Sequence, residues 1–511
     1  MNLQVVWFKR DLRVVDHEAL SRASLLGPVL CFYQVEHEYW QLPDTSNRQW
    51  LFIRESLFDL AEQLQNIGGR LVLFEGNVEV ALKQILCNFG HFTLHSHEEI
   101  GNLWTFERDQ KVARWCRQEH IDWREYAQFG VVRPISKRKS KFKAHWDEWI
   151  SRPPSRVSDN PYFINAELPS ELKLSNLPTL VTYDELDCPL RQLGGRTNGL
   201  LILESFLNHR SERYRGSISS PLTAESGCSR LSPYLANGCL SLREIANAVL
   251  LAQKKVQNSF WKKSLHDYYT RLWWHCYFIQ TFESNHHMEH VALTSAMEKL
   301  DRPFDAEKFE AWKMGRTGWP MVDACMRCLH AHGWFNFRMR AMLVSVATFS
   351  LSLPWRPVAE WLAKLFVDFE PGIHYPQIQM HSGMSGNKTL RIYNPVNQAF
   401  DLDRSGIFVK RWIPELRDIS HTWIFEPWKS KGYLKTGIKS EGGSFYPAPL
   451  VDFEIVHRTA KAKITELRAQ HNIIAAKGFN EQNQKRSRSS SKSSRKRKAT
   501  DDNEGNQLSL F

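Results

Sequence analysis

Residues 228–241 read CSRLSPYLANGCLS, a run in which polar side chains stand directly before an apolar helical pattern. Ser229 and Ser232 flank Arg230 and Leu231, and Pro233 follows at a position typical of a first helical turn. Serine hydroxyls in such a place cap the free N–H groups of a helix, which is the interpretation that the local pattern favours. The same N–H groups attract anions, so a phosphate-binding loop is the second interpretation.

Four short apolar runs mark the first part of the chain. They are residues 3–8, 28–35, 70–76 and 92–97. A helical pattern at 51–69 is typical of the segments between them. Strands that alternate with helices predict a parallel, doubly wound α/β sheet, and we expect this α/β domain to span residues 1–130.

The rest of the chain has a different pattern. Pro, Ser and Asn are frequent between about residues 150 and 190, which predicts an interdomain connector over 131–199. Helical patterns then dominate, so we expect a mainly α-helical domain over 200–470. Residues 471–511 include a Ser-, Lys- and Arg-rich stretch that has too few apolar side chains for a core, which predicts a disordered tail.

The composition points to an anionic partner. The formal net charge is +12, of which residues 482–511 contribute +5 through eight Lys and Arg against three Asp and Glu, leaving +7 for the body. An excess of positive charge favours nucleic acid as a partner. Nine irregularly spaced cysteines are typical of a reducing compartment. No secretory leader and no apolar stretch long enough to cross a membrane are visible, so we expect a cytoplasmic protein.

Three later stretches place polar side chains beside aromatic ones. They are GWFNFRMRAM (333–342), DFEPGIHYPQIQM (368–380) and RIYNPVNQAFDLDRSGIFVKRWIPEL (391–416). Each stretch alone is weak evidence of a functional site, because a basic helix face is usually solvated and a lone His is usually structural. Together with SRLSPYLA and RTGWPMVDACMR, in this order, they resemble the photolyase/cryptochrome family, from VVWFKRDLRVVDHEAL at 5–20 to about residue 430.

The resemblance implies an N-terminal antenna domain and a helical domain that holds a bent FAD. By position it assigns FAD contacts to Tyr214, Cys228, Ser229, Arg230, Leu231, Ser232, Arg340, Asp368, Glu370 and His374. The run 228–232 would hold the diphosphate, and Arg340 would stabilise a reduced, anionic flavin. A second, antenna chromophore is also expected, of a type that the sequence does not identify.

The resemblance further implies DNA contacts and a reaction. The DNA contacts fall on Trp274, Arg338, Met380 and Gln398. Blue light would excite reduced FAD, which passes an electron to a flipped-out pyrimidine dimer in UV-damaged DNA. Trp274 would stack on the lesion, and His275 and His374 are candidate proton donors, so these three are the expected catalytic residues.

Several positions depart from the family pattern. Of the usual three-tryptophan electron chain only Trp355 matches, and Ile378 occupies the inner position. We therefore expect electron transfer through Trp355 and a different aromatic residue, either Tyr375 or Trp334. The first Glu of a helix motif common in the family is replaced by Arg271.

The segment EPGIHYPQIQM looks most similar to the bacterial iron–sulfur branch, whose studied members repair (6-4) photoproducts. That branch holds its cluster with cysteines near the C-terminus, and this chain has none after Cys328, so we expect no iron–sulfur cluster. Cys325 and Cys328, with His330 and His332, also suggest zinc. Because no second Cys pair follows and the segment is predicted to be helical, core packing is the favoured interpretation, and we expect no metal.

The expected function is a DNA photolyase, with the (6-4) photoproduct slightly favoured over the cyclobutane dimer. The alternative is a cryptochrome, a blue-light photoreceptor without repair activity. Trp274 and Gln398 favour repair, whereas Arg271 favours signalling. We expect a bacterial, nucleoid-associated monomer with no membrane contact.

The last five residues, Gln507–Phe511, read QLSLF and follow a long polar stretch. They resemble the pentapeptide by which bacterial polymerases and repair proteins bind the DNA sliding clamp, because extended Leu and Phe side chains can fill an apolar pocket. The alternative is a solvated tail whose basic run, 485–498, attracts DNA weakly and without specificity.

Overall fold

The structure, a computed structural model, describes residues 2–133, 142–178, 188–300, 302–385, 391–430, 437–439, 445–467 and 469. The chain up to Lys461 forms one compact unit. The predicted tail, with Gln507–Phe511, lies outside the described residues. Among the described helices, none is long and apolar enough to cross a membrane.

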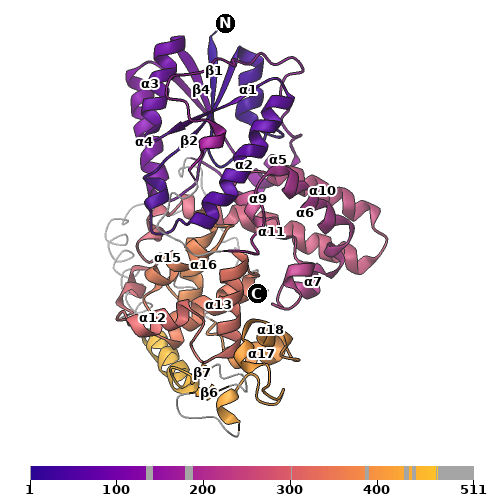
Figure 1. Cartoon of the computed structure of the whole chain (residues 1–511), viewed down its shortest axis with the longest axis vertical. Helices are drawn as coiled ribbons and strands as arrows, with labels where there is room; N and C mark the ends of the chain where they lie inside the picture. Colours follow the sequence, from indigo (N-terminus) through magenta and orange to yellow (C-terminus); the bar gives the residue numbers. More distant parts are fainter. Residues whose placement is uncertain are drawn as a thin grey trace, which may run out of the picture. The chain divides into compact units, whose positions relative to one another are not determined.

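The N-terminal part is built on a five-stranded parallel sheet in the order β3-β2-β1-β4-β5 (Figure 1). The strands are β1 (Leu3–Phe8), β2 (Val29–Val35), β3 (Leu71–Glu75), β4 (Phe92–His97) and β5 (Asp122–Tyr126). Every residue of β1, β2 and β4 is buried, as expected for strands that are covered on both faces. The predicted doubly wound α/β architecture is confirmed.

Helices cover both faces of this sheet. Apolar side chains of α1 (Glu18–Leu26) and α2 (Asn47–Asn66) form one core with Val6, Phe8 and Tyr33. On the opposite face, α3 (Val78–Phe89) and α4 (Leu103–Gln118) pack with Val5 and Trp7. The alternation of Val5, Val6 and Trp7 between the two cores follows from the period of two in a strand.

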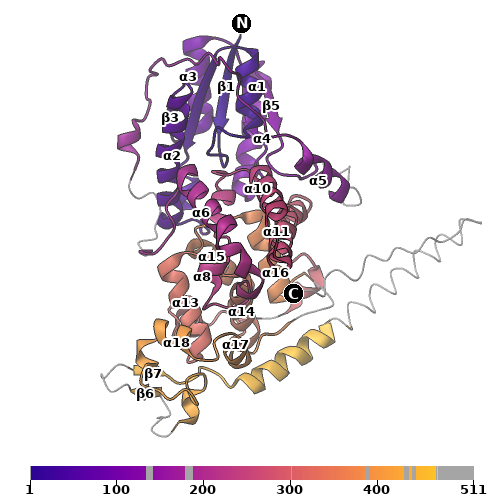
Figure 2. The ribbon, with the colours of Figure 1, turned by 90° about the vertical axis from the view of Figure 1, so that its right-hand side faces the viewer.

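The C-terminal part is mainly helical, as predicted (Figures 1 and 2). Its helices are α5 (Phe142–Ser151), α6 (Arg196–Asn208), α7 (Tyr214–Ser217), α8 (Ala224–Gly227), α9 (Ser232–Ala236), α10 (Leu242–Lys255), α11 (Ser259–Glu283), α12 (Ala306–Lys313), α13 (Pro320–His332), α14 (Phe337–Ser345), α15 (Trp355–Leu365), α16 (Pro371–Ser382), α17 (Pro395–Leu402) and α18 (Ile407–Trp412). A small antiparallel hairpin, β6 (Gly437–Lys439) and β7 (Phe445–Pro447), follows them. The long helix α11 packs along α16.

The two parts meet closely at Gly238. Its φ is +64°, and a Cβ there would lie 2.3 Å from the carbonyl oxygen of Arg10, just after β1. The Leu12 N–H donates to the Asn237 carbonyl at 3.2 Å, and the Arg13 guanidinium donates to the Gly238 carbonyl at 2.9 Å. The core that contains α1 and α2 continues into the helical part through Leu231 and Tyr234. The domain boundaries given above stay a prediction.

Candidate functional site

The run that opens with Cys228 forms a tight loop between α8 and α9. Arg230 has a φ of +60°, which lets the chain turn sharply before Ser232 begins α9. Among the described residues, no side chain caps α9, whose N-cap is Leu231. The capping serine of the run is instead Ser241, which forms a capping box with Glu244 at the start of α10. The side chains of Ser229, Arg230 and Ser232 are therefore not used as helix caps.

Surrounding side chains hold this loop in place. The Arg210 guanidinium donates to the carbonyl oxygens of Cys228 and Ser229. The Trp334 indole N–H donates to the Ser232 hydroxyl at 3.1 Å, and the Arg230 guanidinium lies 4.2 Å from the centre of the Trp334 ring. Two guanidinium groups thus flank a loop with hydroxyl groups, a donor set that suits a diphosphate.

Two tyrosines complete this side of the site. The Tyr268 and Ser229 side chains interact, and the Tyr268 ring lies 5.4 Å from that of Tyr214. Tyr214 is buried, and its hydroxyl is hydrogen-bonded to Arg271. The substituted position Arg271 therefore lies next to the predicted FAD-contacting Tyr214.

An ion pair joins α14 to the segment before α16. The Arg340 guanidinium contacts an oxygen of the Asp368 carboxylate at 2.8 Å and also donates to the Phe335 carbonyl at 2.7 Å. The second oxygen, Asp368 Oδ1, is buried and has no hydrogen-bond partner among the described residues. The Asp368 charge acts electrostatically on both Arg230 and His374, which places these predicted residues in one cluster.

His374 is buried in this cluster on α16. Its Nε2 lies 2.9 Å from the Ala359 carbonyl oxygen, and because a carbonyl only accepts, Nε2 carries the proton. Burial lowers the pKa of His374 to about 4. The imidazole is therefore neutral at pH 7.

Glu370 has a different partner from Asp368. Its carboxylate caps α16 by accepting from the Gly372 N–H and forms a 3.3 Å ion pair with Arg10 of the α/β part. Arg10 also donates to the Phe369 carbonyl at 2.7 Å. His275 lies on α11. Its burial and, to a smaller extent, the positive charge of Arg10 lower the pKa of its imidazole to about 4. Glu370 and His275 are thus linked through Arg10.

The four predicted DNA-contacting residues, Trp274, Arg338, Met380 and Gln398, lie on α11, α14, α16 and α17 and are all partly exposed. The Trp274 ring packs against those of Trp273 and Phe278, at 5.1 and 5.8 Å between centroids. Partial exposure is the condition for contact with a ligand that arrives from solvent.

Trp355, Tyr375, Cys325 and Cys328 are buried, whereas the other two zinc candidates, His330 and His332, are partly exposed. Trp355 begins α15, and Tyr375 on α16 donates from its hydroxyl to Asp44 at 2.9 Å. Cys325 and Cys328 lie in the helical core, where Cys325 Sγ is 3.8 Å from Met321 Sδ. The core-packing interpretation of these cysteines agrees with their positions.

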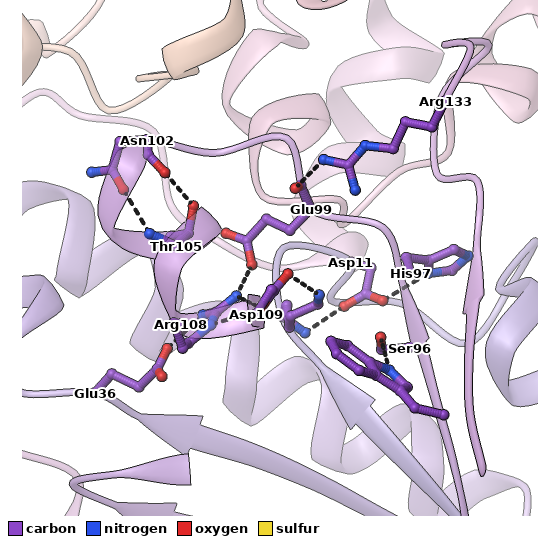
Figure 3. A network of polar contacts seen from close by, with 12 residues as sticks. Asp11, Glu36, Ser96, His97, Glu99, Asn102, Thr105, Arg108, Asp109 and Arg133 are labelled. Carbon is purple, nitrogen blue, oxygen red and sulfur yellow. Dashed lines mark hydrogen bonds and ion pairs between the residues drawn. The ribbon is translucent and has the colours of Figure 1, made fainter. Parts of the chain in front are cut away.

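A pocket that sequence reasoning missed opens at the carboxyl ends of the strands, and Figure 3 shows the network of polar contacts around its residue Arg108. Its lining is Trp7, Phe8, Lys9, Arg10, Tyr33, Gln34, Glu36, Tyr39, Trp40, Gln49, Ile53, Glu99, Thr105, Arg108, Asn237, Val367 and Phe369. The signal was available in the sequence, because Lys9 and Glu36 directly follow predicted strands and Glu99 comes two residues after another, and ligands of open α/β sheets bind at that edge.

Arg108 organises the charges of this pocket. Its guanidinium lies 2.6 Å from Glu36, 2.5 Å from Glu99 and 2.8 Å from Asp109 (Figure 3). Lys9 adds a 3.1 Å contact to Asp109. Burial raises the pKa of Glu36 to about 7 despite the opposing charge of Arg108. Near neutral pH the Glu36 carboxyl can therefore either donate or accept a hydrogen bond.

Asp11, His17 and His97 form a buried cluster beside this pocket, with geometry that could hold a metal ion. The Leu20 N–H donates to His17 Nδ1 at 3.0 Å, and His17 Nε2 lies 2.9 Å from Asp11 Oδ2 without forming a hydrogen bond among the described residues. His97 Nδ1 lies 2.7 Å from the same carboxylate oxygen (Figure 3). The cluster connects the loop after β1 with the start of α1 and with β4, and the His97–Asp11 hydrogen bond uses two of the atoms that could bind a metal.

Two family models match the chain. The model described as DNA photolyase matches residues 4–145, and the model described as FAD binding domain of DNA photolyase matches residues 268–466. A cryptochrome DASH of Gloeobacter violaceus is 28% identical over 475 residues, 88% of this chain and 93% of the relative. A deoxyribodipyrimidine photo-lyase of Alkalihalophilus pseudofirmus is 24% identical over 477 residues, 88% of this chain and 95% of the relative.

Solved structures share the fold over almost the whole chain. A bacterial class III photolyase from Agrobacterium tumefaciens has a TM-score of 0.79 at 24% identity and covers 92% of this chain and 98% of its own. A photolyase from Sulfolobus tokodaii, described with two FAD molecules, has a TM-score of 0.74 at 25% identity, covering 91% and 100%. With both family models matched in order, and with the α/β and helical architecture in place, the chain belongs to the photolyase/cryptochrome family.

Proposed function

We propose that this protein is a light-driven DNA repair enzyme that acts on pyrimidine dimers, with the (6-4) photoproduct favoured over the cyclobutane dimer. The observation that carries the proposal is the cluster of Arg340, Asp368 and His374 next to the loop 228–232. Its orphaned acceptors, Asp368 Oδ1 and Asn336 Oδ1, are buried without partners among the described residues, as expected for atoms that face a polar ligand.

These residues fit FAD, which would supply an electron on excitation by blue light. Arg230 and the hydroxyls of Ser229 and Ser232 would bind the diphosphate, since guanidinium and hydroxyl groups are strong phosphate donors. Arg340 would stabilise negative charge on the reduced ring. These roles need only the side chains that the loop 228–232 and α14 already bring together.

The lesion would be held by the partly exposed residues. Trp274 offers an indole face to a flipped base, and base–aromatic stacking stabilises by about 1–3 kcal/mol. Gln398 would hydrogen-bond to the lesion, Met380 would pack against it, and Arg338 would hold DNA phosphates. His275 and His374 are neutral at pH 7, so either one becomes a proton donor only when a nearby negative charge, such as that of a reduced lesion, raises its pKa.

A blue-light photoreceptor without repair activity is the second candidate. It is favoured by Arg271, which occupies a common Glu position, and by the relative named cryptochrome DASH. The deciding experiment illuminates the purified protein with duplexes that carry a single (6-4) photoproduct or a single cyclobutane dimer, with dark controls. Repair of either lesion supports the enzyme, and bound FAD without repair of either supports the photoreceptor.

The pocket around Arg108 is our proposed site for the second chromophore, since a neighbour of the same fold is described with two FAD molecules. We also propose that the protein holds no iron–sulfur cluster and no zinc. Extraction after denaturation should release FAD and a second absorbing compound. Stoichiometric iron in the purified protein would contradict the second part of this proposal.

We further propose that Gln507–Phe511 bind the bacterial sliding clamp and that the protein acts as a monomer in the cytoplasm, at the nucleoid. An immobilised clamp should retain the full-length protein and release a variant that lacks residues 507–511, while both variants keep the same FAD content. Equal retention of the two would contradict clamp binding.

A further inference from the structure

A buried tyrosine and a buried aspartate meet where α16 approaches the segment before α2. The Tyr375 hydroxyl donates to Asp44 Oδ2 at 2.9 Å, and the two residues are 3% and 2% exposed. Asn102 donates to the same oxygen at 3.4 Å, whereas Asp44 Oδ1 has no partner in the described part of the chain. The acceptor is therefore able to take up a proton.

We propose that Tyr375 and Asp44 form a redox pair, in which Tyr375 gives one electron to photoexcited oxidised flavin while its phenolic proton moves to Asp44. The proposal rests on FAD binding as proposed above. It assigns a role to Asp44, which lies outside every motif that identified the family.

Other carboxylates create a negative field around Tyr375. Glu289, 8% exposed, accepts from the Leu103 N–H at 2.8 Å, and its charge and that of Glu360 both act on Tyr375. Burial, followed by the charges of Asp44 and Glu289, raises the pKa of Tyr375 well above its usual value. The phenol therefore keeps its proton at rest, while the same negative charges make loss of an electron easier.

The charges on the Asp44 side agree with a proton acceptor. Burial raises the pKa of Asp44, which increases the affinity of its carboxylate for a proton. His290 interacts electrostatically with Asp44, and the polar groups around Asp44 also include Tyr375, Asn102, Tyr39, Glu289 and Glu360. A single proton shift along the 2.9 Å hydrogen bond would neutralise the carboxylate.

Aromatic contacts connect Tyr375 to the cluster that fits FAD. Its ring lies 5.4 Å from that of His374, which is in electrostatic contact with Arg340 and Asp368. Phe282 stacks on the Tyr375 ring, with 6.0 Å between the ring centroids. Tyr375 thus lies in direct ring contact with His374, one of the predicted flavin residues.

The step balances. The O–H bond of Tyr375 breaks, the flavin is reduced by the one electron that Tyr375 loses, and the proton forms an O–H bond on Asp44. A neutral tyrosyl radical and a neutral carboxylic acid remain. A thiol reductant in the buffer then supplies one electron, and the proton returns from Asp44 to the phenol.

The test uses the full-length protein with its bound FAD in the oxidised state, illuminated and frozen for electron paramagnetic resonance. The parent should give a tyrosyl radical, Y375F should lack it, and D44N should lower its yield and the photoreduction rate by about tenfold. The matched control is Y446F, because Tyr446 also donates to a buried aspartate, Asp323, at 2.5 Å, away from the cluster. This control should photoreduce like the parent.

Several outcomes would overturn the inference. One is photoreduction of Y375F at the parent rate. Another is an infrared difference spectrum of the parent that shows no new band of a protonated carboxyl group, or one that shows such a band and in which D44N shows the same band. The first infrared result, the presence or absence of the carboxyl band in the parent, does not depend on whether the variants fold. If the parent itself contains no FAD, the proposed function fails with the inference, whereas FAD with normal photoreduction in both variants overturns the inference alone.

Discussion

Arg340 and Asp368 form a 2.8 Å ion pair whose carboxylate is 3% exposed and whose guanidinium is 26% exposed. Arg340 also lies 3.9 Å from the centre of the Phe366 ring, so its position is fixed by an ion pair, a carbonyl and an aromatic face. The guanidinium is held before any ligand arrives, which is the arrangement expected of a preorganised binding group.

The first prediction concerns this pair. Arg340→Ala leaves the buried Asp368 carboxylate without its partner and should lower the free energy of unfolding by about 3 kcal/mol. The same variant should bind less FAD. Urea denaturation and the absorbance ratio of flavin to protein measure the two effects. The double variant Arg340→Ala/Asp368→Ala should regain part of the lost stability but not the lost FAD. Unchanged FAD content in Arg340→Ala would contradict the assignment of Arg340 to the flavin site.

The second prediction concerns the contact between the two parts of the chain. Gly238→Ala would place a methyl group 2.3 Å from the Arg10 carbonyl at a φ of +64°. We expect a loss of roughly 2 kcal/mol or more in the free energy of unfolding. Gly216→Ala is the matched control, because a Cβ there meets nothing within 4 Å. Equal stability of the two variants would show that the close approach is not rigid.

Much of the fold follows from the sequence, for physical reasons that particular strands show. Strands β1 to β3 were predicted because parallel strands covered on both faces are largely apolar runs, and β4 was predicted although four of its six residues, in the sequence FTLHSH, are polar. Strand β5, with the sequence DWREY, was missed because it lies at the edge of the sheet and is partly exposed. The start of α2 at Asn47 was also missed, although Ser46 and Gln49 form a capping box there.

The candidate site was predictable only in part. The motifs named Arg340, Asp368 and His374, and the structure brings these three together. Partners across the chain were not predictable, since Tyr375 and Asp44 are 331 positions apart and no local pattern links them. The pairing of Glu370 with Arg10 was unforeseen for the same reason.

The third prediction concerns pH. Burial and the nearby Asp44 charge raise the pKa of Glu289 from 4.5 to about 7. Between these values the folded state binds more protons than the unfolded state, so stability falls as pH rises from 4.5 to 7. Glu289→Gln should remove this loss, up to about 3 kcal/mol. Urea denaturation at pH 5 and pH 8 tests it, and an unchanged difference between the two pH values in the variant would contradict it.

The fourth prediction concerns the electron route at the start of α15. Trp355 is 6% exposed and is the one residue that matches the family's tryptophan chain. Trp355→Phe should slow flavin photoreduction by about tenfold, because phenylalanine is far harder to oxidise. Trp312→Phe, a change to another buried tryptophan, should have no such effect. A parent-like rate in Trp355→Phe would exclude this residue from the route.

The last prediction concerns His374 and the choice of lesion. Its Nε2 proton is donated to the Ala359 carbonyl, and with a pKa of about 4 the ring does not titrate near pH 7 in the free protein. His374→Ala should therefore keep most of its FAD, because the diphosphate contacts of the loop 228–232 and the ring contact of Arg340 remain, but lose (6-4) repair by about 100-fold or more, the usual contribution of a proton-transferring group. The test measures repair of (6-4) and cyclobutane duplexes in parallel, each with the parent and with the variant. If repair by the parent is confined to cyclobutane dimers, the lesion assignment is wrong. If His374→Ala repairs (6-4) duplexes at the parent rate, His374 is not the proton donor, and His275 becomes the residue to replace next.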